Sequence, residues 1–214
     1  LASKVGIEET YPFSELEKYL VKAKNAGRII HFTPPYRAET KIMLHTMLNI
    51  SFDEMKSKSS VDLIKAIVSL RAIKEQCEID ELEVAAKIGY EMHMMAFKHA
   101  RPGVSEQEIF GLMEGVAYQY GKGPSFPIIL SVRGETLHNH NHSNIMQSGQ
   151  LLLSDAGAQS NKYYTSDYTR TMPVSGKFSD QQKIIYQIVL DANNHALAIT
   201  KPEVTYQSVH LSVC

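Results

Sequence analysis

Cysteine, an excess of charge of one sign and long apolar runs are all scarce or missing in this sequence of 214 residues. The two cysteines, Cys77 and Cys214, are too few for a disulfide scaffold and fit a reducing compartment. The 22 Lys and Arg residues nearly balance the 23 Asp and Glu residues, so no nucleic-acid partner or acidic tail is indicated. No apolar run approaches the roughly 20 residues that span a membrane. We therefore expect a cytoplasmic protein without nucleic-acid or membrane partners.

The first residues of the chain lack the charged start and apolar stretch of a signal peptide. They also lack a methionine and open in the middle of a pattern at Leu1-Ala2-Ser3, so we expect a segment upstream. Apolar residues make up 43% of the sequence, which is enough for a real core. The length fits one large domain, or one domain plus part of another.

Apolar periodicity divides the chain at a polar stretch, residues 51–60, and predicts domains at residues 1–58 and 59–214. In the first domain it predicts helices at residues 14–27 and 38–50, with a short β-prone stretch at residues 28–32. In the second it predicts helices at residues 61–74, 75–100, 105–120 and 179–199. Strands are predicted at residues 128–130, at residues 151–153 and around Tyr163-Tyr164. Helices followed by hairpins and a further helix indicate an α+β fold rather than a regular βαβ alternation.

Two aspartates stand out in the stretch LLLSDAGAQSNKYYTSDYTRT, residues 151–171. Asp155 follows three leucines, so an interior strand ends in a carboxylate, and Asp167 comes twelve residues later. A tight hairpin between them would place the two carboxylates side by side, where they could share or bridge divalent cations. An unpaired buried charge is costly, so the end of an apolar strand is an unusual place for an aspartate without a partner.

Each half of this motif has an ordinary interpretation when taken alone. Asp155-Ala156-Gly157 is typical of a turn, and Asp167 with Arg170 is typical of a surface ion pair. The joint pattern D-x-G, nine residues, D-x-T-R-T fixes six residue types. At ordinary residue frequencies its chance occurrence in a chain of this length is on the order of 10⁻⁵. The joint pattern therefore favours a site over two unrelated surface features.

These residues resemble the first two metal-ligand segments of the pita-bread metallopeptidases, which include Xaa-Pro aminopeptidase (aminopeptidase P), prolidase, methionine aminopeptidase and creatinase. The resemblance extends from about residue 60 to the C-terminus and is strongest to the Xaa-Pro aminopeptidase branch. It implies the first half of a pita-bread fold, preceded at residues 1–58 by the end of a smaller α/β domain. Further segments carry the resemblance: Leu70-Arg71-Ala72-Ile73-Lys74, Glu78-Ile79, Arg101-Pro102-Gly103-Val104-Ser105-Glu106, Leu137-His138 and Pro173-Val174-Ser175-Gly176-Lys177-Phe178.

The resemblance implies a dinuclear site with two divalent metal ions. Asp155 would bind one ion and Asp167 would bridge both, and a hydroxide held between the ions would attack the scissile carbonyl. His138 would contact the substrate and stabilise the tetrahedral intermediate. Manganese suits a carboxylate-rich site, and family members also work with cobalt or zinc.

The resemblance also implies supporting residues around the metals and the substrate. Thr169 and Arg170 would orient the ligands. Phe126 falls near an aromatic residue that lines the family's substrate pocket, and His140 is a rival to His138 for the catalytic role. His138, His140 and His142 alternate, so on a strand they could instead form a separate metal site. The favoured interpretation makes one of them functional and the others polar turn residues near the mouth of the cleft.

The family needs five metal ligands, and this chain contains candidates for the first two only. The remaining His, Glu and Glu follow well downstream of the second Asp, whereas the chain ends at Cys214. The chain is therefore interpreted as a fragment that does not assemble the dinuclear site alone. Glu203 stands where the family usually has glycine, so we expect a different or disturbed turn there.

Three functions remain open at this point. The first is a metal-dependent exopeptidase that removes an N-terminal residue preceding proline, with peptides carrying proline at the second position as substrates. The second is a non-catalytic pita-bread module that binds peptides or proteins. The third is a prolidase acting on Xaa-Pro dipeptides, or a creatinase-like hydrolase. Relatives are often dimers or larger, so the resemblance also implies a homo-oligomer.

Overall fold

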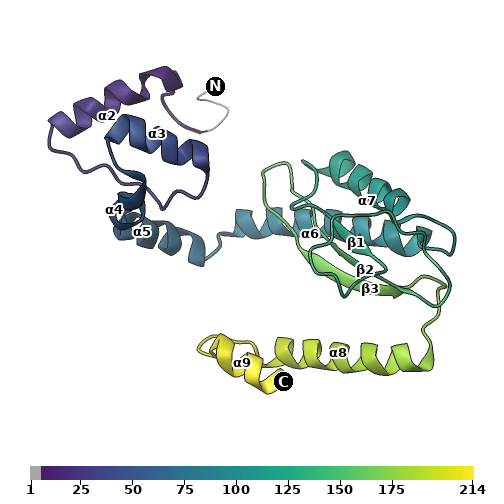
Figure 1. The fold of residues 1–214 in the computed structure, drawn as a ribbon. Helices are drawn as coiled ribbons and strands as arrows, with labels where there is room; N and C mark the ends of the chain where they lie inside the picture. Colours follow the sequence, from purple (N-terminus) through teal and green to yellow (C-terminus); the bar gives the residue numbers. More distant parts are fainter. Residues whose placement is uncertain (1–5) are drawn as a thin grey trace. The chain divides into compact units, whose positions relative to one another are not determined.

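The computed structural model describes residues 6–214, which fall into two compact units, Leu1–Lys74 and Glu75–Cys214. Figure 1 shows the helices and strands of both units. The domain boundary after residue 58 stays a prediction, since compactness assigns the helix that follows it to the first unit.

The first unit is helical and has a small core. Among its residues from 6 onward, the buried apolar side chains are Leu48, Ile50 and Met55. The β-prone stretch at residues 28–32 forms no strand, because the described part of this unit offers no second strand to pair with it. Its elements are η1 (Phe13–Glu15), α2 (Leu16–Asn25), α3 (Ala38–Leu48), η2 (Phe52–Glu54), α4 (Met55–Lys58) and α5 (Val61–Ala72).

The second unit combines two long helices with an antiparallel sheet, as the predicted α+β class requires. Helix α6 spans Gln76–His99 and helix α7 spans Glu106–Tyr120. Ser105 caps α7 by accepting a hydrogen bond from the Glu108 amide. The sheet has the order β1-β2-β3, with β1 at Ile129–Ser131, β2 at Leu151–Ala156 and β3 at Tyr168–Pro173.

Helices α6 and α7 cover one face of this sheet (Figure 1). Along β2, Leu152, Ser154 and Ala156 are buried, whereas the alternate residues are only half-buried. Side chains alternate between the faces of a strand, so Asp155 belongs to the face away from the helices. Its register partners, Ile129 on β1 and Thr169 on β3, share that face. The predicted hairpin is therefore confirmed: it brings the end of β2, at Asp155, beside the start of β3, at Tyr168 and Thr169.

The third strand lies later in the chain than predicted. Tyr163 has a φ of 66°, and the Ser160 hydroxyl accepts hydrogen bonds from the amides of Lys162 and Tyr164. These interactions hold residues 160–164 in a turn. The β-prone tyrosines therefore belong to the turn, and Asp167 immediately precedes β3 instead of following a strand.

Two helices complete the second unit: α8 (Asp180–Ile199) and α9 (Tyr206–Val213). In the turn between them, Glu203 has a φ of 73°, a left-handed conformation that favours glycine. The turn expected to be disturbed thus keeps a glycine-like backbone despite its glutamate. No helix in residues 6–214 is long and apolar enough to cross a membrane.

Candidate active site

Asp155 carries the most unusual polar atom of the described residues. Its Oδ1 is buried and has no hydrogen-bond partner, and it is the single buried side-chain nitrogen or oxygen in residues 6–214 of which this is true. Nearly all buried polar atoms in proteins are hydrogen-bonded, because leaving one without a partner costs about 1–3 kcal/mol. A buried carboxylate oxygen that receives no donor is suited to accept a cation.

Asp167 is exposed and lies directly after a tightly held residue, Ser166. The Ser125 hydroxyl donates to the Ser166 carbonyl oxygen at 2.7 Å, and the Ser166 hydroxyl accepts from the Ala158 amide at 3.1 Å. A Cβ at position 157 would overlap the Ser166 carbonyl, so the glycine of the D-x-G motif permits this close approach. The motif thus fixes the backbone that leads into Asp167.

His93 of α6, which was not identified from the sequence, contacts the two neighbours of Asp155. Its Nε2 lies 3.2 Å from the Ala156 carbonyl oxygen and its Nδ1 lies 3.3 Å from the Ser154 hydroxyl. A carbonyl only accepts, so Nε2 carries the proton and Nδ1 accepts from Ser154. Burial lowers the pKa of His93, which favours this neutral form. One imidazole therefore holds the residues on both sides of Asp155.

The two predicted supporting residues occupy different faces of β3. Thr169 lies opposite Asp155, whereas Arg170 lies opposite Ser154. Arg170 donates to the Thr169 carbonyl oxygen at 2.8 Å, and its guanidinium lies 5.6 Å from the centre of the Tyr168 ring. Thr169 is thus the better placed of the two to support Asp155. The predicted role of each stays a prediction.

His138 lies in the long loop between β1 and β2. It is exposed and has a φ of 53°. Few residues other than glycine adopt this left-handed conformation, and such backbone outliers occur often at functional sites. The loop therefore presents the imidazole to solvent on an unusual backbone.

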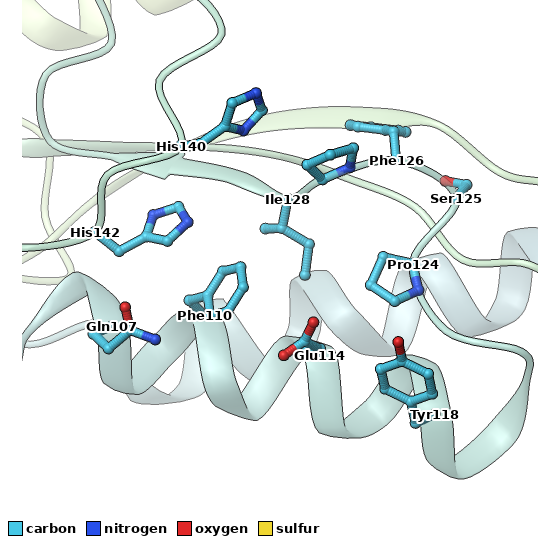
Figure 2. Close-up of a pocket in the computed structure, with 11 residues that line it drawn as sticks. Gln107, Phe110, Glu114, Tyr118, Pro124, Ser125, Phe126, Ile128, His140 and His142 are labelled. Atoms are coloured by element: carbon cyan, nitrogen blue, oxygen red, sulfur yellow. The ribbon is translucent and has the colours of Figure 1, made fainter. Parts of the chain in front are cut away.

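Phe126 and His140, the two candidate pocket residues, line one cavity of about 630 Å³ (Figure 2). Helix α7 contributes Phe110, and the Glu114 carboxylate lies further along the same helix face, toward Tyr118. The other lining residues are Gln107, Pro124, Ser125, Pro127, Ile128 and His142. Since Ser125 lines the cavity and also bonds Ser166, the rim of the cavity adjoins the segment that leads into Asp167.

The three alternate histidines do not form a separate metal site in the described residues. They lie in a loop rather than on a strand. His142 is buried, stacks on Phe110 at a ring-centre distance of 4.4 Å and contacts the Leu130 carbonyl oxygen, whereas His138 and His140 are exposed. No group of three or more His, Cys, Asp or Glu side chains that could hold a metal ion is present within residues 6–214.

Comparison with known proteins identifies a family and relatives of this chain. Residues 80–214 match Metallopeptidase family M24. The chain is 28% identical to Xaa-Pro aminopeptidase of Escherichia coli over 98% of this chain and 50% of that protein. It is 24% identical to human Xaa-Pro aminopeptidase 3 over 96% of this chain and 41% of that protein. The chain therefore spans about half the length, or less, of these relatives.

Solved structures give the same result. A substrate complex of a variant of E. coli aminopeptidase P is 26% identical to this chain, with a TM-score of 0.82 over 99% of this chain and 50% of that one. A product complex of zinc-substituted E. coli aminopeptidase P gives the same values. The predicted first half of a pita-bread fold is confirmed by these matches. The chain belongs to metallopeptidase family M24.

Proposed function

We propose that this chain provides the first part of the active site of a metal-dependent exopeptidase that cleaves the Xaa-Pro bond at peptide N-termini. The observation that carries the proposal is the buried Asp155 Oδ1 that receives no hydrogen bond. The aminopeptidase names of the relatives support the reaction class. Because the chain spans half of these relatives or less, the activity belongs to the whole protein and not to these residues alone.

Asp155 and Asp167 would hold the metal ions, and the chemistry of this donor set fits hard divalent cations such as manganese. When bound, such ions make a nucleophile available near neutral pH and polarise the scissile carbonyl. Each residue of this chain then has a separate task. Asp155 and Asp167 fix the position of the ions, and His138 donates a hydrogen bond to the oxygen on which negative charge develops.

Substrate recognition would use the cavity that Phe126 and His140 line. Proline has no N–H to donate and a fixed φ, so a peptidase must recognise its ring by shape rather than by backbone hydrogen bonds. Phe126 offers an apolar wall for such contacts, and His140 adds a polar group at the rim. Thr169 and Arg170 would keep the metal-binding backbone in place. We further propose a cytoplasmic homo-oligomer, as the resemblance implies.

The test uses the full-length gene product and peptides with proline at the second position. Asp167→Ala is expected to abolish hydrolysis and to lower the bound metal measured by mass spectrometry, with an unchanged circular dichroism spectrum. Asp191→Ala, which removes an exposed aspartate of α8, is the matched control and should retain full activity. Wild-type turnover in Asp167→Ala would disprove the assignment.

Two further measurements separate the alternatives. His138→Ala should lower turnover while both metals stay bound, and loss of metal would show that its role is misassigned. The protein should cleave longer peptides with proline at the second position in addition to Xaa-Pro dipeptides. Cleavage of dipeptides alone would indicate a prolidase, and peptide binding without any cleavage would indicate a binding module.

A further inference from the structure

The Glu106 side chain is fully buried, with 0% exposed area, although it carries a carboxylate. Its Oε1 accepts hydrogen bonds from the Val132 amide at 2.7 Å, the Ser131 hydroxyl at 3.1 Å and the Asn144 side-chain amide at 3.1 Å. Its Oε2 accepts from the same Asn144 side chain at 3.0 Å and from the Asn144 backbone amide at 3.4 Å. The activity proposed above makes no use of this group.

The partners of Glu106 lie at the two ends of one loop. Ser131 and Val132 mark the end of β1, and Asn144 comes twelve residues after Val132. The segment between them, residues 133–143, carries His138. The Glu106 backbone amide also donates to the Asn144 carbonyl oxygen at 3.0 Å, which strengthens the attachment at the second end. One residue of α7 therefore joins both ends of the loop.

The hydrogen bonds of the buried Glu106 carboxylate are strong, and this strength explains how they would hold the ends of the loop. A buried carboxylate loses its hydration and is stabilised only when donors surround it. Hydrogen bonds to a charged group contribute about 1.5–3 kcal/mol each, more than bonds between neutral groups. Residues 133–143 form no helix or strand, so the loop has no internal ladder to fix its shape. Its conformation therefore depends on where its ends are held and on the contacts of His142, the one buried residue of the segment.

We infer that Glu106 is a positioning residue for His138: its carboxylate fixes both ends of the 133–143 loop and so sets where the imidazole lies. The inference rests on the role proposed for His138. Glu106 does not touch the substrate or the metals in this scheme. Displacing a catalytic group by about 1 Å can cost roughly 100-fold in rate, so release of the loop should lower kcat by about 10- to 100-fold.

The test compares Glu106→Gln with Glu108→Gln in the full-length protein. Both variants remove one negative charge from the first turn of α7, but Glu108 is exposed. Glu106→Gln places an amide NH₂ opposite the Asn144 donors and breaks their hydrogen bonds. We expect faster hydrogen exchange at residues 133–143, a lower kcat and unchanged metal content, with a rise in KM because the same loop carries His140 of the cavity. Glu108→Gln should show none of these changes.

A double variant distinguishes positioning from general destabilisation. If Glu106 acts through His138, then Glu106→Gln with His138→Ala should be no slower than His138→Ala alone. Additive losses in kcat would overturn the inference, as would unchanged exchange in the loop. If Glu106→Gln fails to fold, Asn144→Ala loosens the second end alone and is expected to give the same pattern more weakly.

The two proposals can fail separately. If His138→Ala retains full turnover, the role proposed for His138 is wrong and the inference fails with it, whatever the exchange data show. If His138→Ala is slow but Glu106→Gln leaves both kcat and loop exchange unchanged, the proposed activity stands and the inference about Glu106 falls.

Discussion

Two carboxylates of the same unit are buried in opposite ways. Glu106, at the start of α7, is surrounded by donors from β1 and from the Asn144 segment. Asp155, at the end of β2, has a buried oxygen that no donor reaches. Removing a charge from water is costly. The cost must be offset either by hydrogen bonds from the protein itself or by a bound ligand such as a cation.

The difference is the one expected between Glu106 as a structural carboxylate and Asp155 as the metal ligand proposed above. The bonds of Glu106 are all made within the chain, so its charge contributes to a single stable arrangement. In the proposed site, the buried Oδ1 of Asp155 would make the end of β2 less stable, and a bound cation would offset this cost. A buried polar atom that the chain itself leaves without a partner is more typical of functional sites than of protein cores.

The largest expected effect is the loss of the compensated carboxylate. Glu106→Ala would leave the donors of Ser131, Val132 and Asn144 without their acceptor, and each buried donor left without a partner costs about 1–3 kcal/mol. We expect urea denaturation to show a loss of unfolding free energy of that size. Glu108→Ala, in the same helical turn, should cost only the roughly 0.5 kcal/mol typical of exposed positions. Equal effects of the two variants would remove the contrast between Glu106 and Asp155.

A smaller effect, dependent on metal, is expected at Asp155. In metal-free protein, Asp155→Ala should not lower the unfolding free energy, because no hydrogen bond of Oδ1 is lost and a buried oxygen without a partner costs about 1–3 kcal/mol. Manganese should raise the melting temperature of the wild type, since a ligand that binds only the native state stabilises it. The variant should lose most of that rise, whereas Thr169→Ala, on the opposite strand, should keep most of it. A metal-free variant that is several kcal/mol less stable would mean that Asp155 has a structural role instead.

Sequence reasoning found Asp155 and its hairpin but missed Glu106 and His93 as contributors, and the reason is physical. The end of β2 is specified locally, by three leucines and the D-x-G motif. Glu106 appears in the sequence only as the end of a segment that carries the resemblance and the start of a helix, and His93 only as a polar residue within an apolar helix. Their partners lie between 25 and 63 residues away, and only the tertiary fold brings these partners within reach.

The position of β3 was missed for a related reason. Tyr163 and Tyr164 are β-prone, but hydrogen bonds to the Ser160 hydroxyl favour a turn over a strand. The Tyr164 hydroxyl also donates to Glu78 of α6 at 2.8 Å. Propensity thus predicts the number of strands in the described sheet but not the place of the third, because side-chain contacts with a distant helix decide where that strand begins.

The smallest expected effect concerns a third carboxylate, Glu81 of α6, which has partners but lies nearer the surface. Its Oε1 pairs with the Lys162 ammonium at 2.9 Å, and its Oε2 accepts from the Ser160 hydroxyl at 2.9 Å. Both interactions favour the charged form and lower the pKa of Glu81 below its ordinary value of 4.5. The pair therefore stabilises the native state above that value, and this contribution is lost as the pH falls through the lowered pKa.

Glu81→Gln should accordingly be less stable than the wild type at pH 7, and the difference should shrink as the pH falls below 4.5. Chemical denaturation at several pH values measures this convergence, with exposed Glu83→Gln on the same helix as the control. A difference that is constant with pH would show that Glu81 acts through packing or a neutral hydrogen bond rather than through its charge. Convergence would place Glu81 between the two buried carboxylates: compensated like Glu106, but in a setting where solvent screens most of the interaction.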